Sequence, residues 1–238
     1  MHSPSVVSPP RHSGPHGAVR VAGALALASV LLTVAVALSW APLTGLDGDV
    51  ARVTHRWALR EGGVTGATRF LSDWVWDPWT MRLLCAGVVV WLWGWFRDRW
   101  TAVWLAVTCA VGSVLQQVLK AAVDRPRPFW ARPVDSASYA AFPSGHAMTA
   151  TVVCGALVWL LYRLGAPRGA RRTASAAAVV CVVGVGATRV WLGVHWPSDV
   201  VGGWLLGGLL VALAALAHER WHPEGVEAAG GTGRAERR

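Results

Sequence analysis

Six long apolar runs constrain the fold of this chain more than any other feature of its sequence. They cover about residues 21–40, 80–96, 101–118, 147–164, 173–190 and 200–217, in a chain of 238 residues that is 54% hydrophobic and 15% charged. Each run is long enough to cross the hydrocarbon core of a bilayer as a helix, which takes about 17–25 residues. The sequence therefore predicts an all-α fold, a polytopic membrane bundle of about six transmembrane helices.

The first apolar run can be interpreted in two ways. Basic residues precede it and the tripeptide at 37–39 resembles a cleavage site, as in a secretory signal peptide. The run is longer than the roughly 7–15 apolar residues of such a peptide, which favours a retained membrane helix. The polar segments 1–17 and 218–238 are predicted to be disordered, so the membrane domain covers residues 18–217.

The segment between the first two runs, residues 41–79, mixes charged and apolar positions. In its second half, large apolar side chains recur at helical spacing from Phe70 to Trp79, beside Asp73 and Asp77. This pattern predicts an interfacial helix with tryptophans at headgroup depth. A surface loop packed on the bundle is the alternative.

Arginine accounts for almost all of the net charge of +9, because Lys120 is the only lysine. The arginines lie mostly at the ends of apolar runs, so the positive-inside rule explains them better than nucleic-acid binding does. Placing both termini and the turns at 97–99 and 163–172 in the cytoplasm puts twelve of the 22 basic residues there. The loops at 121–146 and 189–199 then share the extracytoplasmic face.

The four cysteines lie in four different apolar runs, without a CxxC pair or a cluster with histidine at metal-ligand spacing. They are interpreted as small buried hydrophobic residues. No metal and no cofactor is expected. The oligomeric state stays open, and Gly202-Gly203 with Gly207-Gly208 indicate only close helix packing.

The turn Pro143-Ser144-Gly145-His146 opens the fourth apolar run. Ser144 is placed to cap a helix whose N-terminus offers free N–H groups and a positive dipole end to a phosphate. Gly145 would let the backbone approach an oxyanion, and His146 could donate a proton to a leaving oxygen. A capped helix with an interfacial histidine would explain the same residues.

His195 lies just before the sixth run, which Pro197 is suited to begin as a helix. Asp199 follows His195 by four residues, close enough to hold one ring nitrogen and raise the basicity of the other. A histidine held in this way can act as a nucleophile. A capping contact would explain the spacing equally well.

Cations gather at the membrane boundaries near these turns. Arg127 and Arg189 could each bind phosphate oxygens in bidentate fashion, while Lys120 supplies a point charge. Several fixed donors suit the spread negative charge of a phosphoryl transition state. Interfacial snorkelling, which also accounts for Arg82, is the alternative. Arg125, two residues before Arg127, has no expected role.

The three clusters follow one another as Lys120-x6-Arg127-Pro128, Pro143-Ser144-Gly145-His146 and Arg189-x5-His195-x3-Asp199. In that order they resemble the type 2 phosphatidic acid phosphatase family, which shares this signature with vanadium haloperoxidases and bacterial acid phosphatases. Thr188 departs from the family, which usually has serine before the arginine. The motifs cover about residues 120–199, and the six-span layout extends the resemblance to most of the chain.

The resemblance implies a metal-independent phosphatase that works through a phosphohistidine. On that basis His195 attacks phosphorus, Asp199 orients it, and His146 protonates the leaving group. The residues expected to hold the phosphate are Lys120, Arg127, Ser144, the Gly145 amide and Arg189. The order of steps and the choice of nucleophile rest on the resemblance alone.

The predicted function is that of a multi-pass lipid phosphatase of the cell membrane, with its active site on the extracytoplasmic face. Its expected substrates are lipid phosphates in the bilayer: undecaprenyl diphosphate, phosphatidic acid or phosphatidylglycerol phosphate. One alternative is a vanadate-dependent haloperoxidase-like enzyme, which the six spans argue against because those enzymes are soluble. The other is a non-catalytic membrane scaffold or transporter.

Overall fold

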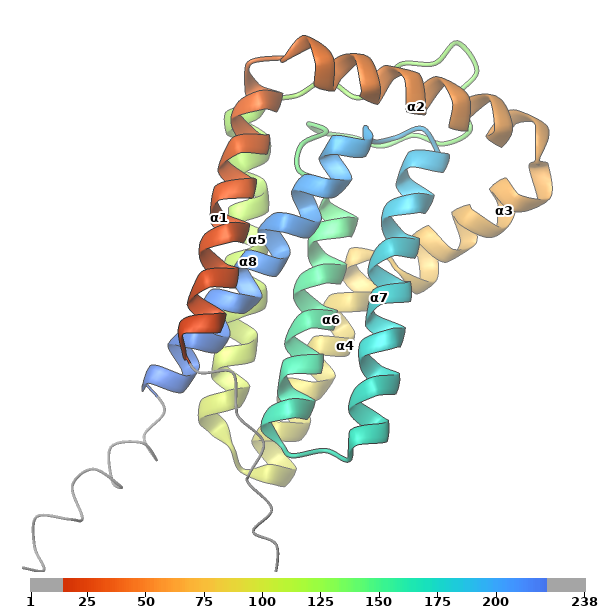
Figure 1. Ribbon diagram of the computed structural model, residues 1–238. Helices are drawn as coiled ribbons and strands as arrows, with labels where there is room; N and C mark the ends of the chain where they lie inside the picture. Colours follow the sequence, from red (N-terminus) through yellow and green to blue (C-terminus); the bar gives the residue numbers. More distant parts are fainter. Residues whose placement is uncertain (1–14, 222–238) are drawn as a thin grey trace, which may run out of the picture.

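The computed structural model describes residues 15–221, and all regular elements in that range are helices (Figure 1). The elements are α1 (Pro15–Ala37), α2 (Ala41–Arg60), α3 (Gly62–Phe70), the π-helical turn η1 (Leu71–Val75), α4 (Pro78–Trp91), the π-helical turn η2 (Leu92–Phe96), α5 (Arg99–Val123), α6 (Gly145–Arg163), α7 (Arg168–Trp191) and α8 (Pro197–Trp221). Six helical segments in the described range are long and apolar enough to cross a membrane, with residues 62–96 counted as one. The predicted all-α membrane bundle is confirmed.

The spanning helices run up and down the bundle, and α2 lies crosswise over one end of it (Figure 1). The C-terminal ends of α5 and α7 and the N-terminal ends of α6 and α8 all lie at the α2 end. The loops at 124–144 and 192–196 are therefore neighbours, as the up-and-down order of the six runs predicted. The α4–α5 and α6–α7 turns lie at the opposite end.

The helices extend past the predicted limits of the membrane domain at both ends. Helix α1 begins at Pro15 and α8 continues to Trp221, so the segments predicted to be disordered overlap these helices. His218, placed in the predicted tail, is buried, and its Nε2 lies 3.2 Å from the Thr101 hydroxyl. The rest of those two segments, 1–14 and 222–238, lies outside the described residues.

A helix does lie across the bundle between the first two spans, but its residues differ from those whose pattern predicted it. The crosswise helix is α2, residues 41–60. Residues 70–79 instead comprise the end of α3, the π-helical turn and the start of α4. Asp77 caps α4 by accepting the Trp79 N–H at 2.7 Å, so a regular α-helix resumes here within the second span.

The core lies between α4, α5 and α6, and α8 packs closely against α6. A cluster of apolar side chains fills the first region: Met81, Cys85, Leu92, Ala102, Leu105, Val153, Ala156 and Leu160. A side chain at Gly203 would place its Cβ 2.9 Å from the Ser144 carbonyl oxygen, and one at Gly207 would come 2.8 Å from Thr151. These glycines bring the N-terminal ends of α6 and α8 together, as close packing predicted. The four cysteines are free thiols.

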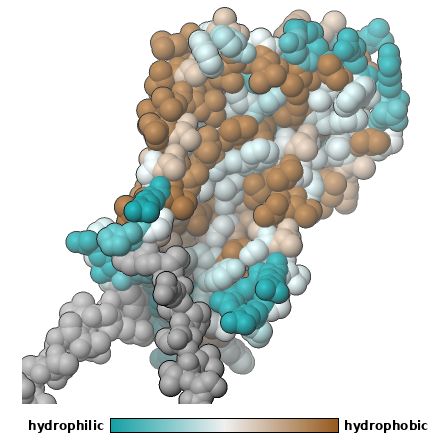
Figure 2. Space-filling model, in the orientation of Figure 1, coloured by the Kyte–Doolittle hydropathy of each residue, from teal (hydrophilic) through white to brown (hydrophobic). Residues whose placement is uncertain are grey.

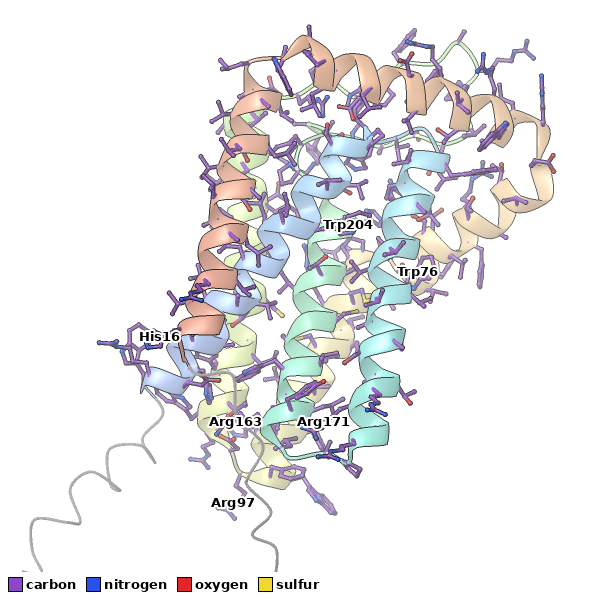
Figure 3. The ribbon with its side chains drawn as sticks, in the orientation of Figure 1. His16, Trp76, Arg97, Arg163, Arg171 and Trp204 are labelled. Carbon is purple, nitrogen blue, oxygen red and sulfur yellow. The ribbon has the colours of Figure 1, made fainter. Side chains whose placement is uncertain are left out.

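The surface separates apolar flanks from polar ends. Hydrophobic residues cover much of the bundle's side, and hydrophilic residues gather at the α2–α3 corner and at the α6–α7 turn (Figure 2). The labelled side chains of Arg97, Arg163 and Arg171 lie at the end opposite α2 (Figure 3). Arg163 pairs there with Asp98 at 3.9 Å. This distribution suits a bundle that spans a bilayer with its α2 end in one aqueous phase.

Candidate active site

A cavity of about 300 Å³ lies at the α2 end of the bundle, where the ends of four spanning helices meet the 124–144 loop. Six of the eight residues predicted for the site line it: Lys120, Arg127, Gly145, His146, Arg189 and His195. We call this space the cationic cavity. The other two predicted residues, Ser144 and Asp199, are fully buried and do not line it.

The hydrogen bonds of His195 determine which of its ring nitrogens carries a proton. Nη1 of Arg127 lies 3.1 Å from Nε2 of His195. A guanidinium can only donate, so Nε2 accepts this bond and is unprotonated. The proton of the neutral ring then lies on Nδ1, which is 3.3 Å from Oδ2 of Asp199 and donates to it. The electron pair that a nucleophile needs is therefore on Nε2, where it accepts the hydrogen bond of Arg127.

The electrostatic surroundings of His195 favour its neutral form. The side chain is only 2% exposed. Burial lowers the pKa of His195 well below its ordinary value, and the positive charges of Arg127 and Arg189 lower it further. An imidazole that stays neutral keeps its Nε2 electron pair available.

Arg127 links the two loops that frame the cavity. Its Nε donates to the Tyr139 carbonyl at 2.8 Å, and Nη2 donates to the Ser138 carbonyl at 2.9 Å. Its Nη1 donates to the Val194 carbonyl at 2.6 Å. All these partners are neutral, so the guanidinium keeps its full charge at the edge of the cavity. Lys120 likewise donates to a carbonyl, that of Ala140.

Arg189 is buried in the last turn of α7 and is held by a serine from another element. Its Nη1 donates to the Ser72 hydroxyl at 2.6 Å, and its Nε has no hydrogen-bond partner. Ser72 is fully buried in the π-helical turn η1, so this irregular turn supplies the contact that positions Arg189. The Thr188 hydroxyl donates to the Val185 carbonyl within α7.

The turn at the start of α6 joins that helix to α5 and α8. Ser144 caps α6, as predicted, with its hydroxyl 3.5 Å from the Ala147 N–H. Its own N–H donates to the Asp199 carbonyl at 2.9 Å, which joins the starts of α6 and α8. A Cβ on Gly145 would lie 2.7 Å from the Gln116 side chain, so a close approach of α5 also requires glycine there. Direct contact of the Ser144 hydroxyl with a phosphate stays a prediction.

Arg125, for which the sequence indicated no role, lies in a network of buried charges behind His195. Its Nη1 donates to Oδ1 of Asp199 at 2.6 Å, and its Nη2 donates to Oδ2 of Asp47 at 2.7 Å. Ser198 joins them: its hydroxyl accepts from Arg125 at 2.7 Å and its N–H donates to Asp47 at 2.9 Å. We call Asp47, Arg125, Ser198 and Asp199 the buried ion-pair network. It fixes the carboxylate that holds His195.

Asp47 was missed because its helix resembles a surface helix in sequence. The buried positions of α2 are Asp47, Ala51, His55 and Ala58, a single helical stripe that faces the bundle. His55 stacks on Trp130 with ring centroids 4.0 Å apart, and the Trp130 indole donates to the Gly193 carbonyl at 2.8 Å. The available signal was that Asp47 and His55 recur at helical spacing with two alanines, Ala51 and Ala58.

Within residues 15–221, no group of three or more His, Cys, Asp or Glu side chains could hold a metal ion. The donors around the cavity are cations and histidines, which suit an anion better than a cation. That the protein needs no metal or cofactor stays a prediction.

The fold is that of a multi-pass membrane protein, and its cavity has the cations and the oriented histidine that suit a phosphate group. The sequence profile of the PAP2 superfamily matches residues 101–223, about half of the chain. The chain belongs to the PAP2 superfamily.

Proteins of known activity are similar to this chain. Phosphatidylglycerophosphatase B of Bacillus subtilis is 35% identical over 119 residues, which make up 50% of this chain and 58% of that protein. Lipid A 1-phosphatase of Rhizobium etli is 32% identical over 132 residues, covering 51% and 52% of the two chains. The chain thus spans little more than half the length of these relatives. An undecaprenyl-diphosphatase of Sulfolobus acidocaldarius is 29% identical, covering 66% and 70%.

A solved structure is similar over most of the fold. The crystal structure of a transmembrane PAP2-type phosphatidylglycerolphosphate phosphatase from Bacillus subtilis superposes with a TM-score of 0.75 at 25% identity. The match covers 85% of this chain and 98% of that one. The structural match therefore extends beyond the motifs at residues 120–199 and includes helices that precede them.

Proposed function

We propose that this protein is a membrane lipid phosphatase that removes a terminal phosphate from a lipid phosphomonoester or diphosphate. The observation that carries the proposal is the unprotonated Nε2 of His195 on the wall of the cationic cavity, with Nδ1 held by Asp199. The family and the three relatives, each named as a phosphatase or diphosphatase, support it.

The proposed chemistry assigns one role to each of the two histidines. His195 Nε2 attacks phosphorus and the bond from phosphorus to the lipid oxygen breaks. His146, which can carry a proton once the negative phosphate offsets the cavity cations, gives that proton to the lipid oxygen. Neutral His146 then takes a proton from water, whose oxygen attacks phosphorus and breaks the phosphorus–nitrogen bond. Inorganic phosphate leaves, and both histidines return to their starting forms. Arg127, Arg189 and Lys120 stabilise the negative charge of the phosphoryl group in both steps.

The proposed place of the reaction is supported by the arrangement of the helices. The cavity lies at one end of the spanning helices, so a lipid can keep its chains in the bilayer while its headgroup enters. We assign this end to the extracytoplasmic face, because both helical termini and the arginines of the 97–99 and 163–172 turns lie at the other end. The protein is then a multi-pass protein of the cell membrane with lipid phosphates as its partners.

Phosphate release from purified lipids in EDTA tests the proposal. The wild type is expected to release phosphate with the chelator present, and His195→Ala is expected to lose at least about 10⁴-fold in kcat, as when a catalytic nucleophile is removed. The matched control is His16→Ala, at the far end of the bundle (Figure 3), with unchanged activity. Loss of activity on chelation, or full activity of His195→Ala, would refute the mechanism.

The two alternatives fit the findings less well. A haloperoxidase-like enzyme is disfavoured by the six candidate spans and by the phosphatase relatives. A scaffold or transporter is disfavoured because the described structure retains every predicted site residue in or directly behind one cavity.

A further inference from the structure

Arg82 of α4 is a charged residue inside a candidate membrane span, and it lines the cationic cavity. Charged residues within spans are costly, and they commonly face a functional cavity. Interfacial snorkelling was the sequence interpretation of Arg82. The structure instead buries its Nε without a hydrogen-bond partner and places the guanidinium 5.6 Å from the Trp79 ring centroid.

Arg82 lies on the bilayer side of the cavity. Besides the cationic cavity it lines an apolar groove of about 360 Å³ between α4 and α5, together with Cys109 and Ser113. Those two residues lie about two to three helical turns before Lys120 on α5, farther from the α2 end. Arg82 therefore stands where the cavity meets the apolar groove.

The lining of the cavity carries cations without a lining carboxylate among the described residues. Four cations line it, Arg82, Lys120, Arg127 and Arg189, and no carboxylate of the described residues lines it. The last three surround His195 and suffice for a single phosphate group. Arg82 has no ion pair within residues 15–221, and it lies near the N-terminus of α4, where the helix dipole adds to the positive potential. Arg82 therefore has a charge available for a second anionic group.

We propose that Arg82 binds a second phosphate of the substrate, the one between the scissile phosphate and the lipid chain. The inference rests on the proposed phosphatase function and narrows its substrate class. A lipid that extends from His195 toward the groove passes Arg82 with its next group, and a guanidinium binds phosphate oxygens in bidentate fashion. The protein then prefers lipids with two phosphates to lipids with one. The two phosphates are joined directly in a prenyl diphosphate and through a glycerol in phosphatidylglycerol phosphate.

Two pairs of lipids with matched chains test the inference. One pair is undecaprenyl diphosphate and undecaprenyl monophosphate, and the other is phosphatidylglycerol phosphate and phosphatidic acid. For the wild type, kcat/KM is expected to be at least about tenfold higher on the two-phosphate member of at least one pair. The pair that shows the preference identifies the source of the second phosphate.

Variants assign the preference to Arg82. Arg82→Gln is expected to lower the specificity ratio about 10- to 100-fold, and Arg82→Lys, which keeps the charge but not the fork of donors, less so. Arg52→Gln, an exposed arginine paired with Asp49 on α2, is the matched control and should keep the ratio. An unchanged ratio in Arg82→Gln, or an equal loss on all four lipids, overturns the inference.

A further measurement needs no variant. Inorganic pyrophosphate is expected to inhibit the wild type at least about tenfold more strongly than inorganic phosphate, because it can reach both parts of the cavity. Equal inhibition, or equal kcat/KM within both lipid pairs, overturns the role of Arg82 even if the glutamine variant does not fold. Release of phosphate from none of the four lipids would instead refute the proposed phosphatase function.

Discussion

Arg125 and Arg127 are separated by one proline, yet they lie in opposite electrostatic surroundings. Arg125 points behind His195, where two carboxylates, Asp47 and Asp199, pair with its guanidinium. Arg127 points to the cavity side, where its partners are carbonyls and the His195 ring. Arg125 thus belongs to a support in which carboxylates pair with the cation. Arg127 belongs to an anion site in which no carboxylate of the described residues does.

The difference has opposite consequences for stability and function. In the buried ion-pair network every charge has a partner, so removing one leaves another buried and unpaired, which costs about 3–5 kcal/mol. The cations of the cationic cavity have no carboxylate partner among the described residues. Their mutual repulsion lowers stability until a phosphate arrives, which is the usual relation between stability and activity at a functional site.

Arg189→Gln tests the cationic cavity and has the largest expected effect of the changes that probe this comparison. Removing one fixed donor from the site of developing charge is expected to lower kcat/KM about 10²- to 10³-fold. Thermal stability in detergent is expected to stay the same or rise, because glutamine removes a buried charge whose hydrogen-bond partner, the Ser72 hydroxyl, is neutral. A large drop in Tm would place Arg189 in the support of the fold instead.

Asp47→Asn tests the buried ion-pair network. The change removes the negative charge between Arg125 and Ser198 and is expected to destabilise the protein by about 3–5 kcal/mol. We expect kcat to fall about tenfold through misplacement of Asp199 and His195, with little change in product inhibition by inorganic phosphate. Asp49→Asn, whose carboxylate is exposed and pairs with Arg52, is the matched control and should change neither. Weaker phosphate inhibition in Asp47→Asn would contradict a supporting role.

The sequence predicted the residues of the cationic cavity better than those of the buried ion-pair network. Length and apolarity are enough to indicate six spans, because a bilayer fixes the length of a crossing helix. The motifs, taken in order, also identified six residues that line one cavity. Asp47 could not be paired with Arg125 in this way, because the two are 78 positions apart and their contact depends on how α2 crosses the bundle. Ser72 was missed for a related reason, since a π-helical turn has no clear sequence pattern.

The titration of His195 tests whether the cations of the cavity lower its pKa. Burial and the neighbouring cations lower the pKa of His195, so its ring is expected to stay neutral as the pH falls through 6.5, the ordinary histidine pKa. Arg127→Gln removes one of these cations, so the pKa of His195 should rise toward that ordinary value. Ring ¹⁵N chemical shifts followed against pH measure the pKa of His195 in the wild type and in Arg127→Gln. The His195→Ala variant assigns the signal. A His195 that charges near pH 6.5 in the wild type would contradict a nucleophile kept neutral by its surroundings.

Ser72→Ala has the smallest expected effect and tests whether a neutral contact is enough to hold a cavity cation. The hydroxyl of Ser72 accepts one hydrogen bond, at 2.6 Å, from Arg189 and leaves its charge intact. Its loss is expected to lower kcat/KM about 3- to 10-fold, in line with one hydrogen bond to a charged group whose other contacts remain. Thr68→Val on α3, whose hydroxyl bonds only within its own helix, is the matched control. If Ser72→Ala were as inactive as Arg189→Gln, the π-helical turn would be as necessary to the anion site as the cation itself.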